Sequence, residues 1–298
     1  MAQRTQTLPA ISFEVRGRAG FGRRLWNTAR SNPLGVVGLV LIATLALTGI
    51  FADTIAHHPI DAFAGKPNST PSADFWFGTN KFGQDIFSRV VYGAQISMKV
   101  GFISVMCGTA VGLVVGATSG YRGGLADTII QRIVDTAIAF PQLIFLLLVI
   151  RSLGPSERNV ILVIAILIVP GVSRVVRGAA LAQKGNMYIE AARSLGASDT
   201  RIVFRHVVPN LVPIAIVLAT TLLGTAILAE SALSFLGLGI PPPNPSWGFD
   251  INGARTAYPI NVSAALFPGL AISLTVLGFN FLGDSLRDIL DPRLRGSR

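Results

Sequence analysis

Residues 100–121 read VGFISVMCGTAVGLVVGATSGY, an uninterrupted run without a charged residue. A helix needs about 20 mostly apolar residues to cross a bilayer, so this run predicts a transmembrane helix. Glycines recur within it at steps of four, at Gly108, Gly112, Gly116 and Gly120. Because lipid gives little hydrophobic drive between helices, such a stripe favours close packing of one helix backbone against another. The stretch therefore predicts a polytopic helical membrane protein.

Other apolar stretches extend this prediction to six spans. They are Pro33–Phe51, Leu125–Ile150, Asn159–Ser173 with some residues beyond it, Val207–Leu236 and Asn261–Gly283. Prolines at positions 141, 170 and 213 lie within or near these spans, and each removes a backbone hydrogen bond and permits a kink. In the third span, Arg132 and Asp135 stand three residues apart and are expected to pair with each other.

The composition agrees with a bilayer protein. The 298 residues are 51% apolar and 13% charged, whereas a soluble domain carries about 25% charged residues. The net charge of +10 resides in short basic segments beside the apolar spans, which favours membrane topology over nucleic-acid binding. Cys107 is the single cysteine, so the chain alone can form neither a disulfide nor a thiolate metal site.

The distribution of Lys and Arg predicts the orientation. One set of connecting segments carries 6, 1, 6 and 4 of these residues, namely 1–32, 120–127, 171–206 and 284–298. The opposite set carries 3, 2 and 1, namely 53–94, 151–159 and 237–261. The first set, with both termini, is therefore expected in the cytoplasm. The first span is too long for a typical signal peptide and is expected to stay uncleaved.

Three parts follow from this topology. Residues 1–32 form a basic cytoplasmic tail, 33–94 contain the first transmembrane helix and an external loop, and 95–298 form a five-helix core. The external loop contains several aromatic residues and is expected either to pack on the helix ends or to contact a delivering protein. His57 and His58 have no convincing set of further metal ligands around them, so no metal site is expected there.

A basic stretch between the fourth and fifth spans reads EAARSLGASDTRIVFRHVVP over residues 190–209. Asn186 is placed to cap a short helix over Met187–Leu195, which Gly196 would end. Small residues in this helix would keep one face narrow enough to enter a groove of another protein.

A second short helix is expected after the glycine, capped by Ser198 or Asp199 and stopping before Pro209. Two short helices joined at a glycine make a compact unit that a soluble partner can grip. The residues expected to form this surface are Glu190, Ala191, Ala192, Leu195, Gly196, Ala197, Arg201, Arg205 and Pro209. From spacing alone, an ordinary amphipathic surface loop remains the alternative.

The triplet Glu190–Ala192, Gly196 six residues after Glu190 and Pro209 thirteen further on resemble the EAA loop of ABC importer permeases. That family usually has an apolar residue at the place of His206 and Leu at the place of Val208. In the family this loop docks on an ATPase subunit and passes its motion to the membrane. The resemblance implies the same role for residues 186–209, called the EAA loop below.

Three further segments are similar to dipeptide and oligopeptide permeases, and to the second, C-type, of their two permease subunits. These contain FGTN, GQD, SR and YGA within residues 77–94, LSFLGLG, PP and PSWG within 233–248, and GDSLRD and DPR within 283–293. The family usually has Asp at the place of Asn80 and Arg at that of Gln84. The resemblance covers roughly residues 30 to 298. It implies an all-α fold of six transmembrane helices with a cytoplasmic coupling-helix loop, as in type I ABC importer permeases.

The same resemblance implies the partners and the location. A homologous second permease subunit would complete the pore, two ABC ATPase subunits would bind ATP and Mg, and an extracytoplasmic substrate-binding protein would deliver dipeptides or oligopeptides. The chain would lie in the lipid bilayer of the bacterial plasma (inner) membrane. It contains no G-x-x-x-x-G-K-[ST] phosphate loop and no common hydrolase motif. No catalytic residue, cofactor or metal site is therefore expected on this chain, and no nucleic-acid partner.

Alternatives remain at two points. Permeases for nickel and other small solutes are closely similar to the peptide family, and a secondary transporter would instead need ionisable residues within the membrane. Glu230 is the most isolated acid near a span. It is a candidate for the translocation path, where it would meet an ammonium group of the cargo. Equally, it would hydrogen-bond to neighbouring helix ends.

Overall fold

The structure, a computed structural model, describes residues 30, 32–255 and 261–290. Regular structure in these ranges is helical apart from one isolated bridge between Thr79 and Asp85, so the predicted all-α fold is confirmed. The helices are α2 (Pro33–Ile50), α3 (Ala52–Ile55), α4 (Ile86–Arg122), α5 (Gly124–Ala139), α6 (Gln142–Leu153), α7 (Glu157–Gln183), α8 (Met187–Ser194), α9 (Asp199–Ile202), the π-helical turn η1 (Val203–Val207), α10 (Val208–Phe235), α11 (Trp247–Ala254) and α12 (Ser263–Leu290). Most of the basic tail and the DPR motif at 291–293 lie outside the described residues.

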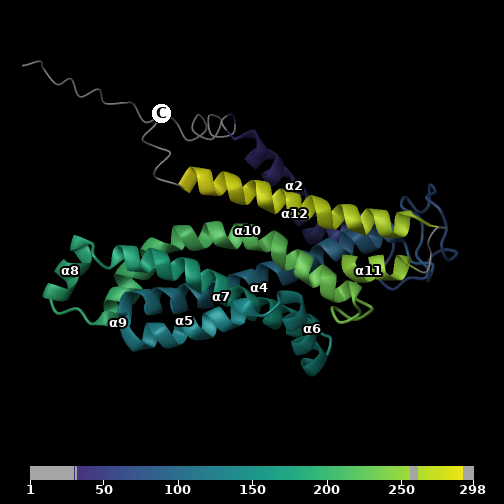
Figure 1. Cartoon of the computed structure of the whole chain (residues 1–298). Coiled ribbons are helices and arrows are strands. Elements are labelled where there is room, and N and C mark those ends of the chain that lie inside the picture. The colour runs from purple at the N-terminus through teal and green to yellow at the C-terminus, as the bar shows by residue number, and fades with distance from the viewer. Residues whose placement is uncertain (1–29, 31, 256–260, 291–298) are drawn as a thin grey trace, which may run out of the picture. The chain divides into compact units, whose positions relative to one another are not determined.

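Among the described residues, five helical runs are long and apolar enough to cross a membrane, and α5 with α6 makes a sixth if the bent pair counts as one span. The five are α2, α4, α7, α12 and the run from α9 through α10. Figure 1 shows α8 and α9 at one end of the bundle and α11 at the other, with α4, α7 and α10 running between them. Each of the six predicted stretches therefore contains helical structure. The predicted boundary between the external loop and the five-helix core, at residues 94/95, falls inside α4.

The third predicted span is not one straight helix. Its two parts, α5 and α6, meet at an angle of 94°. Between them, Phe140 has an extended backbone with ψ 132°, and Pro141 precedes the first residue of α6. A proline disfavours helical geometry in the residue before it and lacks an N–H of its own, so the helix ends here. The predicted third span, Leu125–Ile150, is therefore a bent pair of helices, with the break at the proline that was expected to permit a kink.

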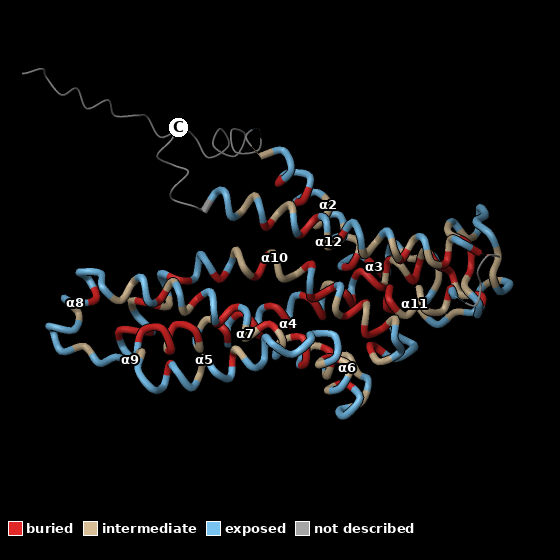
Figure 2. The backbone as a smooth tube through the Cα atoms, in the orientation of Figure 1, coloured by how far each residue is buried: buried red, intermediate tan, exposed pale blue. Residues whose placement is uncertain are grey.

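The core lies along α4, α7 and α10, whose facing sides are buried (Figure 2). The glycine stripe of α4 packs closely against another helix, as predicted, and that helix is α7. A Cβ atom added at Gly112 would lie 2.8 Å from the Cβ of Val172, and one at Gly116 would lie 2.5 Å from the carbonyl oxygen of Ser173. Real side chains almost never approach this closely, so the two backbones touch because these positions are glycine.

Replacing Gly116 with alanine is expected to force α4 and α7 apart and to lower the free energy of unfolding by about 1–3 kcal/mol, the usual cost of overpacking. Gly178→Ala on α7 is the matched control, because an added Cβ there meets no atom within 4 Å. Thermal unfolding of the detergent-solubilised protein would measure both. An unchanged midpoint in Gly116→Ala would contradict the close contact.

Two ion pairs join α5 to α7. Asp127 accepts two hydrogen bonds from Arg177, at 2.6 and 2.7 Å, and is also hydrogen-bonded to Ser119 of α4. Asp135 pairs with Arg174 at 2.6 Å. The predicted pairing of Asp135 with Arg132 on the same helix was therefore wrong, since Arg174 on the neighbouring helix comes closer to the carboxylate.

Candidate functional site

The EAA loop begins with α8, which carries one fully buried anchor, Ile189. The helix covers Met187–Ser194, close to the prediction, although the side chain of Asn186 makes no capping hydrogen bond. Gly196 ends the helix with a positive φ of +78°. Its N–H donates to the carbonyl of Arg193 and the N–H of Ala197 to that of Ala192. This paired pattern is a common helix termination that favours glycine, so the predicted role of Gly196 as helix terminator is confirmed.

The second half of the loop differs from the prediction. The Oγ of Ser198 accepts a hydrogen bond from the N–H of Arg201 and caps α9. The helix does not stop before Pro209, however, because the π-helical turn η1 leads from α9 directly into α10. In this turn the N–H of Val208 donates to the carbonyl of Val203. Such a wider turn shifts the bonding pattern by one residue, so that the missing N–H of Pro209 falls in the first turn of α10, where it is tolerated.

A buried tyrosine ties both halves of the loop to the end of α4. Tyr121 is 1% exposed. Its hydroxyl accepts a hydrogen bond from Arg193 at 3.1 Å and donates one to Asp199 at 3.3 Å. The contact with Tyr121 raises the pKa of Arg193 above its usual value. Since Arg193 lies in α8 and Asp199 in α9, one side chain fixes the position of both short helices against the membrane helices.

The outer surface of the loop carries large apolar side chains that the rest of the chain leaves open. Met187 is 86% exposed and Leu195 is 89% exposed. Of the residues predicted for this surface, those exposed are Glu190, Ala191, Leu195, Gly196, Arg201, Arg205 and Pro209. Ala192 and Ala197 are half-buried and pack against the main core instead. Apolar side chains beside basic ones on a rigid projection form a surface suited to a protein partner.

Glu230 lies at the opposite end of α10 and is completely buried. Its Oε1 accepts hydrogen bonds from the hydroxyls of Ser234 and Ser246, both at 2.7 Å. Its Oε2 accepts longer ones, at 3.4 Å, from Ser97 and Ser231. Through these contacts the carboxylate links α10 to α4 and to the start of α11. The geometry favours the alternative of hydrogen bonding to neighbouring helix ends, while a role in the translocation path stays a prediction.

Glu230→Leu is expected to destabilise the protein by about 2–4 kcal/mol, because Ser234 and Ser246 would keep buried hydroxyls without their acceptor. Glu230→Gln retains one acceptor oxygen and should cost less. Chemical unfolding in detergent would measure both variants. If Glu230 instead meets cargo, Glu230→Gln would leave stability unchanged and alter uptake among peptides of different charge.

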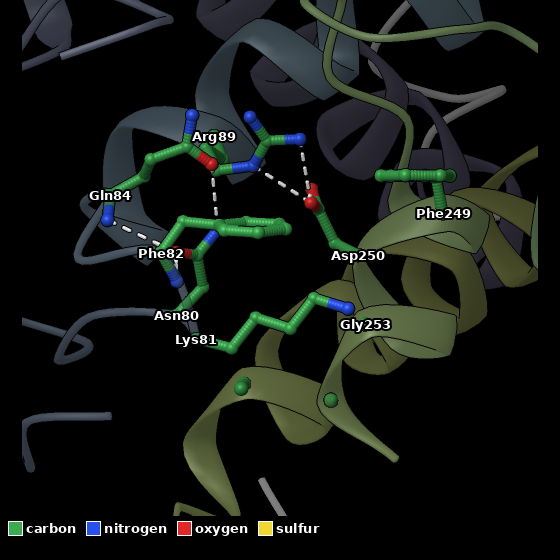
Figure 3. Close-up of a pocket in the computed structure, with 10 residues that line it drawn as sticks. Asn80, Lys81, Phe82, Gln84, Arg89, Phe249, Asp250 and Gly253 are labelled. Atoms are coloured by element: carbon green, nitrogen blue, oxygen red, sulfur yellow. Dashed lines mark hydrogen bonds and ion pairs between the residues drawn. The ribbon is translucent and has the colours of Figure 1, made fainter. Parts of the chain in front are cut away.

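The end of the molecule that carries α11 is held by an ion pair (Figure 3). The Nε and a terminal nitrogen of Arg89 both lie 2.7 Å from the same oxygen of Asp250, joining α4 to α11. Burial raises the pKa of the Asp250 carboxyl, and Arg89 opposes that shift. Close by, the side-chain amide of Asn80 donates to that of Gln84 at 2.8 Å. Asn80 and Gln84, two of the positions that depart from the family pattern, therefore pair with each other as neutral amides.

Comparison with known proteins identifies the family. Residues 109–296 match the family model described as binding-protein-dependent transport system inner membrane component. Residues 20–73 match the N-terminal TM domain of oligopeptide transport permease C. The chain is 42% identical over 273 residues to the glutathione transport system permease protein GsiD of Escherichia coli O6:K15:H31, covering 91% of this chain and 90% of the relative. The protein of the same name from Shigella boydii serotype 4 matches with the same identity and coverage.

A solved structure supports the fold. The chain resembles a chain from a structure of inward-facing conformations of the MetNI methionine ABC transporter with a TM-score of 0.55 and 22% identity. The match covers 68% of this chain and 96% of the other. With its membrane-spanning helices and EAA loop, the chain therefore belongs to the binding-protein-dependent transport system inner membrane components, the permease subunits of ABC importers.

Proposed function

We propose that the chain is one of two homologous permease subunits of an importer for dipeptides or oligopeptides, including small peptides such as glutathione. The similarity to an oligopeptide permease domain and to permeases named for glutathione transport supports this cargo. As a member of its family the chain works with an ATPase and a substrate-binding protein. We propose an assembly of this chain, one homologous permease partner and two copies of the ATPase.

The EAA loop is the surface that docks on the ATPase in this proposal. The observation that carries it is the exposure of Met187 and Leu195, 86% and 89%, on a loop that Tyr121 holds in place. An apolar side chain presented on a rigid support loses little conformational freedom when it enters a pocket, which favours binding. The exposed Arg201 and Arg205 would supply polar contacts at the rim.

Motion of the loop would reach the far side of the membrane through one continuous helix. Helical structure runs unbroken from Asp199 to Phe235 over 37 residues, a length of about 55 Å at 1.5 Å per residue. Its first turn is bonded to Tyr121 and its far end holds Glu230. ATP binding would close the ATPase dimer, displace the EAA loop and tilt this helix, so that the cargo cavity opens to alternate sides.

This mechanism requires the EAA loop and both termini to face the cytoplasm, as the distribution of Lys and Arg favours. The test is a Leu195→Cys variant in a Cys107→Ala background, treated with a membrane-impermeant maleimide. Labelling is expected in inside-out vesicles from cells that produce the chain without its ATPase, and is expected to be absent in intact spheroplasts. Labelling of the cysteine in intact spheroplasts would overturn the proposed orientation.

The transport test uses the complete complex reconstituted in vesicles with its ATPase, second permease and binding protein. ATP-dependent accumulation of a labelled tripeptide is expected, and omission of any one component should abolish it. Nickel uptake under the same conditions tests the alternative cargo. Uptake at the full rate without ATP, or accumulation of nickel and not of peptide, would contradict the proposal.

A further inference from the structure

A cavity of about 880 Å³ lies between the broken pair α5–α6 and the helices α7 and α10. This volume is within the range of about 300–1,000 Å³ that is typical of small-molecule sites. Most of its wall is apolar, but Thr136, Gln142, Thr221 and Thr225 add uncharged hydrogen-bonding groups. Mostly apolar walls with a few polar groups are the usual composition of a ligand pocket.

Among the described residues that line this cavity, Arg132 is the one that carries a charge. Acids stand near it on α5, but both are already engaged by α7, Asp127 by Arg177 and Asp135 by Arg174. In the described part of the chain, no ion pair or hydrogen bond engages the guanidinium of Arg132, although Thr136 donates a hydrogen bond to its backbone carbonyl. Its side chain is exposed on the cavity wall.

A guanidinium in this position needs an explanation. An ionised side chain within membrane-spanning segments is costly and usually faces a water-filled cavity or an oppositely charged partner. The charge is also not required for the fold of this chain, since it bonds to nothing that the structure describes. A cation kept on the wall of a ligand-sized cavity points to an anionic group that enters the cavity.

We propose that Arg132 binds a carboxylate of the cargo as it crosses this subunit. The inference rests on the proposed function, peptide import, because free peptides carry a carboxylate at the C-terminus. The guanidinium presents N–H donors in a planar fork that matches the two carboxylate oxygens. The hydroxyl of Thr225 and the amide of Gln142 are available to peptide groups of the same cargo. The hydroxyls of Thr136 and Thr221 donate to carbonyls of their own helices and can still accept a hydrogen bond.

One cation without further charged groups also suits a transient site. A path for solutes must bind well enough to admit the cargo and weakly enough to release it. A single exposed guanidinium beside water meets that requirement, whereas a buried cluster of charges would hold the peptide. Selection among peptides would stay with the binding protein.

The experiment measures initial uptake rates in vesicles that hold the complete complex. Two tripeptides are compared, one with a free C-terminal carboxylate and one with an amidated C-terminus and no acidic side chain, both confirmed to load the binding protein. We expect Arg132→Gln to lower uptake of the free-carboxylate peptide by about tenfold, the effect expected for loss of a hydrogen bond to a charged group. Uptake of the amidated peptide should equal that of the wild type.

Two further variants serve as controls. Arg132→Lys keeps the positive charge and should retain most of the uptake of the free-carboxylate peptide. Arg151→Gln removes the same charge from neighbouring α6, at an exposed residue that does not line the cavity, and should leave the ratio of the two uptake rates unchanged. ATPase stimulation by loaded binding protein and co-purification of all subunits are measured for each variant.

Three outcomes would overturn the proposal. Equal uptake of the free-carboxylate peptide by the wild type and Arg132→Gln would remove Arg132 from the path. Loss of the second permease from purified Arg132→Gln complex would assign the side chain to a contact between subunits. Failure of the wild-type complex to import any peptide would overturn the proposed function and this inference with it. This outcome differs from failure of the inference alone, because it appears without any substitution.

Discussion

Gly196→Val is expected to uncouple ATP hydrolysis from transport while the protein still inserts and folds. Gly196 adopts a φ of +78°, a region that costs a β-branched residue about 1–3 kcal/mol. The loop would relieve this strain by changing its path, which would separate α8 from α9 and displace the surface proposed to meet the ATPase. Stimulation of the ATPase by loaded binding protein should fall by about tenfold or more.

Gly185→Val is the matched control for this change. Gly185 lies just before α8, has no positive φ, and an added Cβ meets no atom within 4 Å. Gly185→Val tests the effect of a valine near α8 without backbone strain. Stimulation of the ATPase by loaded binding protein should stay close to that of the wild type. Normal stimulation in Gly196→Val, with all subunits co-purifying, would count against the EAA loop as the docking element.

Leu195→Asp is expected to abolish co-purification with the ATPase. The side chain is 89% exposed, so the change should not disturb the fold of this chain. In the proposed complex the same side chain enters a pocket, where burying a leucine contributes about 1.5–3 kcal/mol and burying a carboxylate is unfavourable. The affinity for the ATPase should fall by roughly a hundredfold or more, measured by binding of purified ATPase to the permease complex.

The control for Leu195→Asp makes the same substitution at another exposed leucine. Leu125 in the first turn of α5 is 80% exposed and lies outside the EAA loop. Leu125→Asp should retain the ATPase. Equal loss of binding in both variants would mean that added negative charge, and not the loss of one docking side chain, weakens the complex.

The sequence predicts the membrane helices well where the apolar run is continuous. It predicts them less well where a basic residue in the helix pairs with an acid elsewhere in the chain. The charge-free run begins at Val100, but α4 begins at Ile86. The earlier turns contain Arg89 and Lys99, and each pairs with an acid distant in sequence, Asp250 and Glu157. Composition alone gives no sign of such partners, so the hydrophobic pattern marked only the part of α4 without charges.

The prolines in the apolar stretches also differ in their effect on the helix. Pro141 and Pro213 both lie in apolar stretches, yet the chain bends by 94° after Phe140 while Pro213 stays inside one helix. At Pro209 a π-helical turn absorbs the missing donor. The sequence therefore locates where a helix can break, and tertiary packing decides whether it does.

The position of the proposed docking surface was predictable from the sequence, but the contacts that support it were not. The quoted motif located Leu195 and Gly196, and local rules gave the helix ends. The anchoring by Tyr121 depends on contacts with Arg193 and Asp199, 72 and 78 residues away in sequence, which no local pattern indicates. Met187 was not singled out, although its place at the start of an amphipathic helix was the available signal.

The break between α5 and α6 has a consequence for the surroundings of the chain in the bilayer. Phe140 and Pro141 are both exposed on the isolated subunit, and the first N–H groups of any helix lack partners within it. Irregular backbone at this depth is tolerated only against protein or water, because hydrocarbon leaves each such group unsatisfied. Since Phe140 and Gln142 line the cavity described above, the break requires that this cavity hold water or be covered by protein whenever the chain lies in the bilayer.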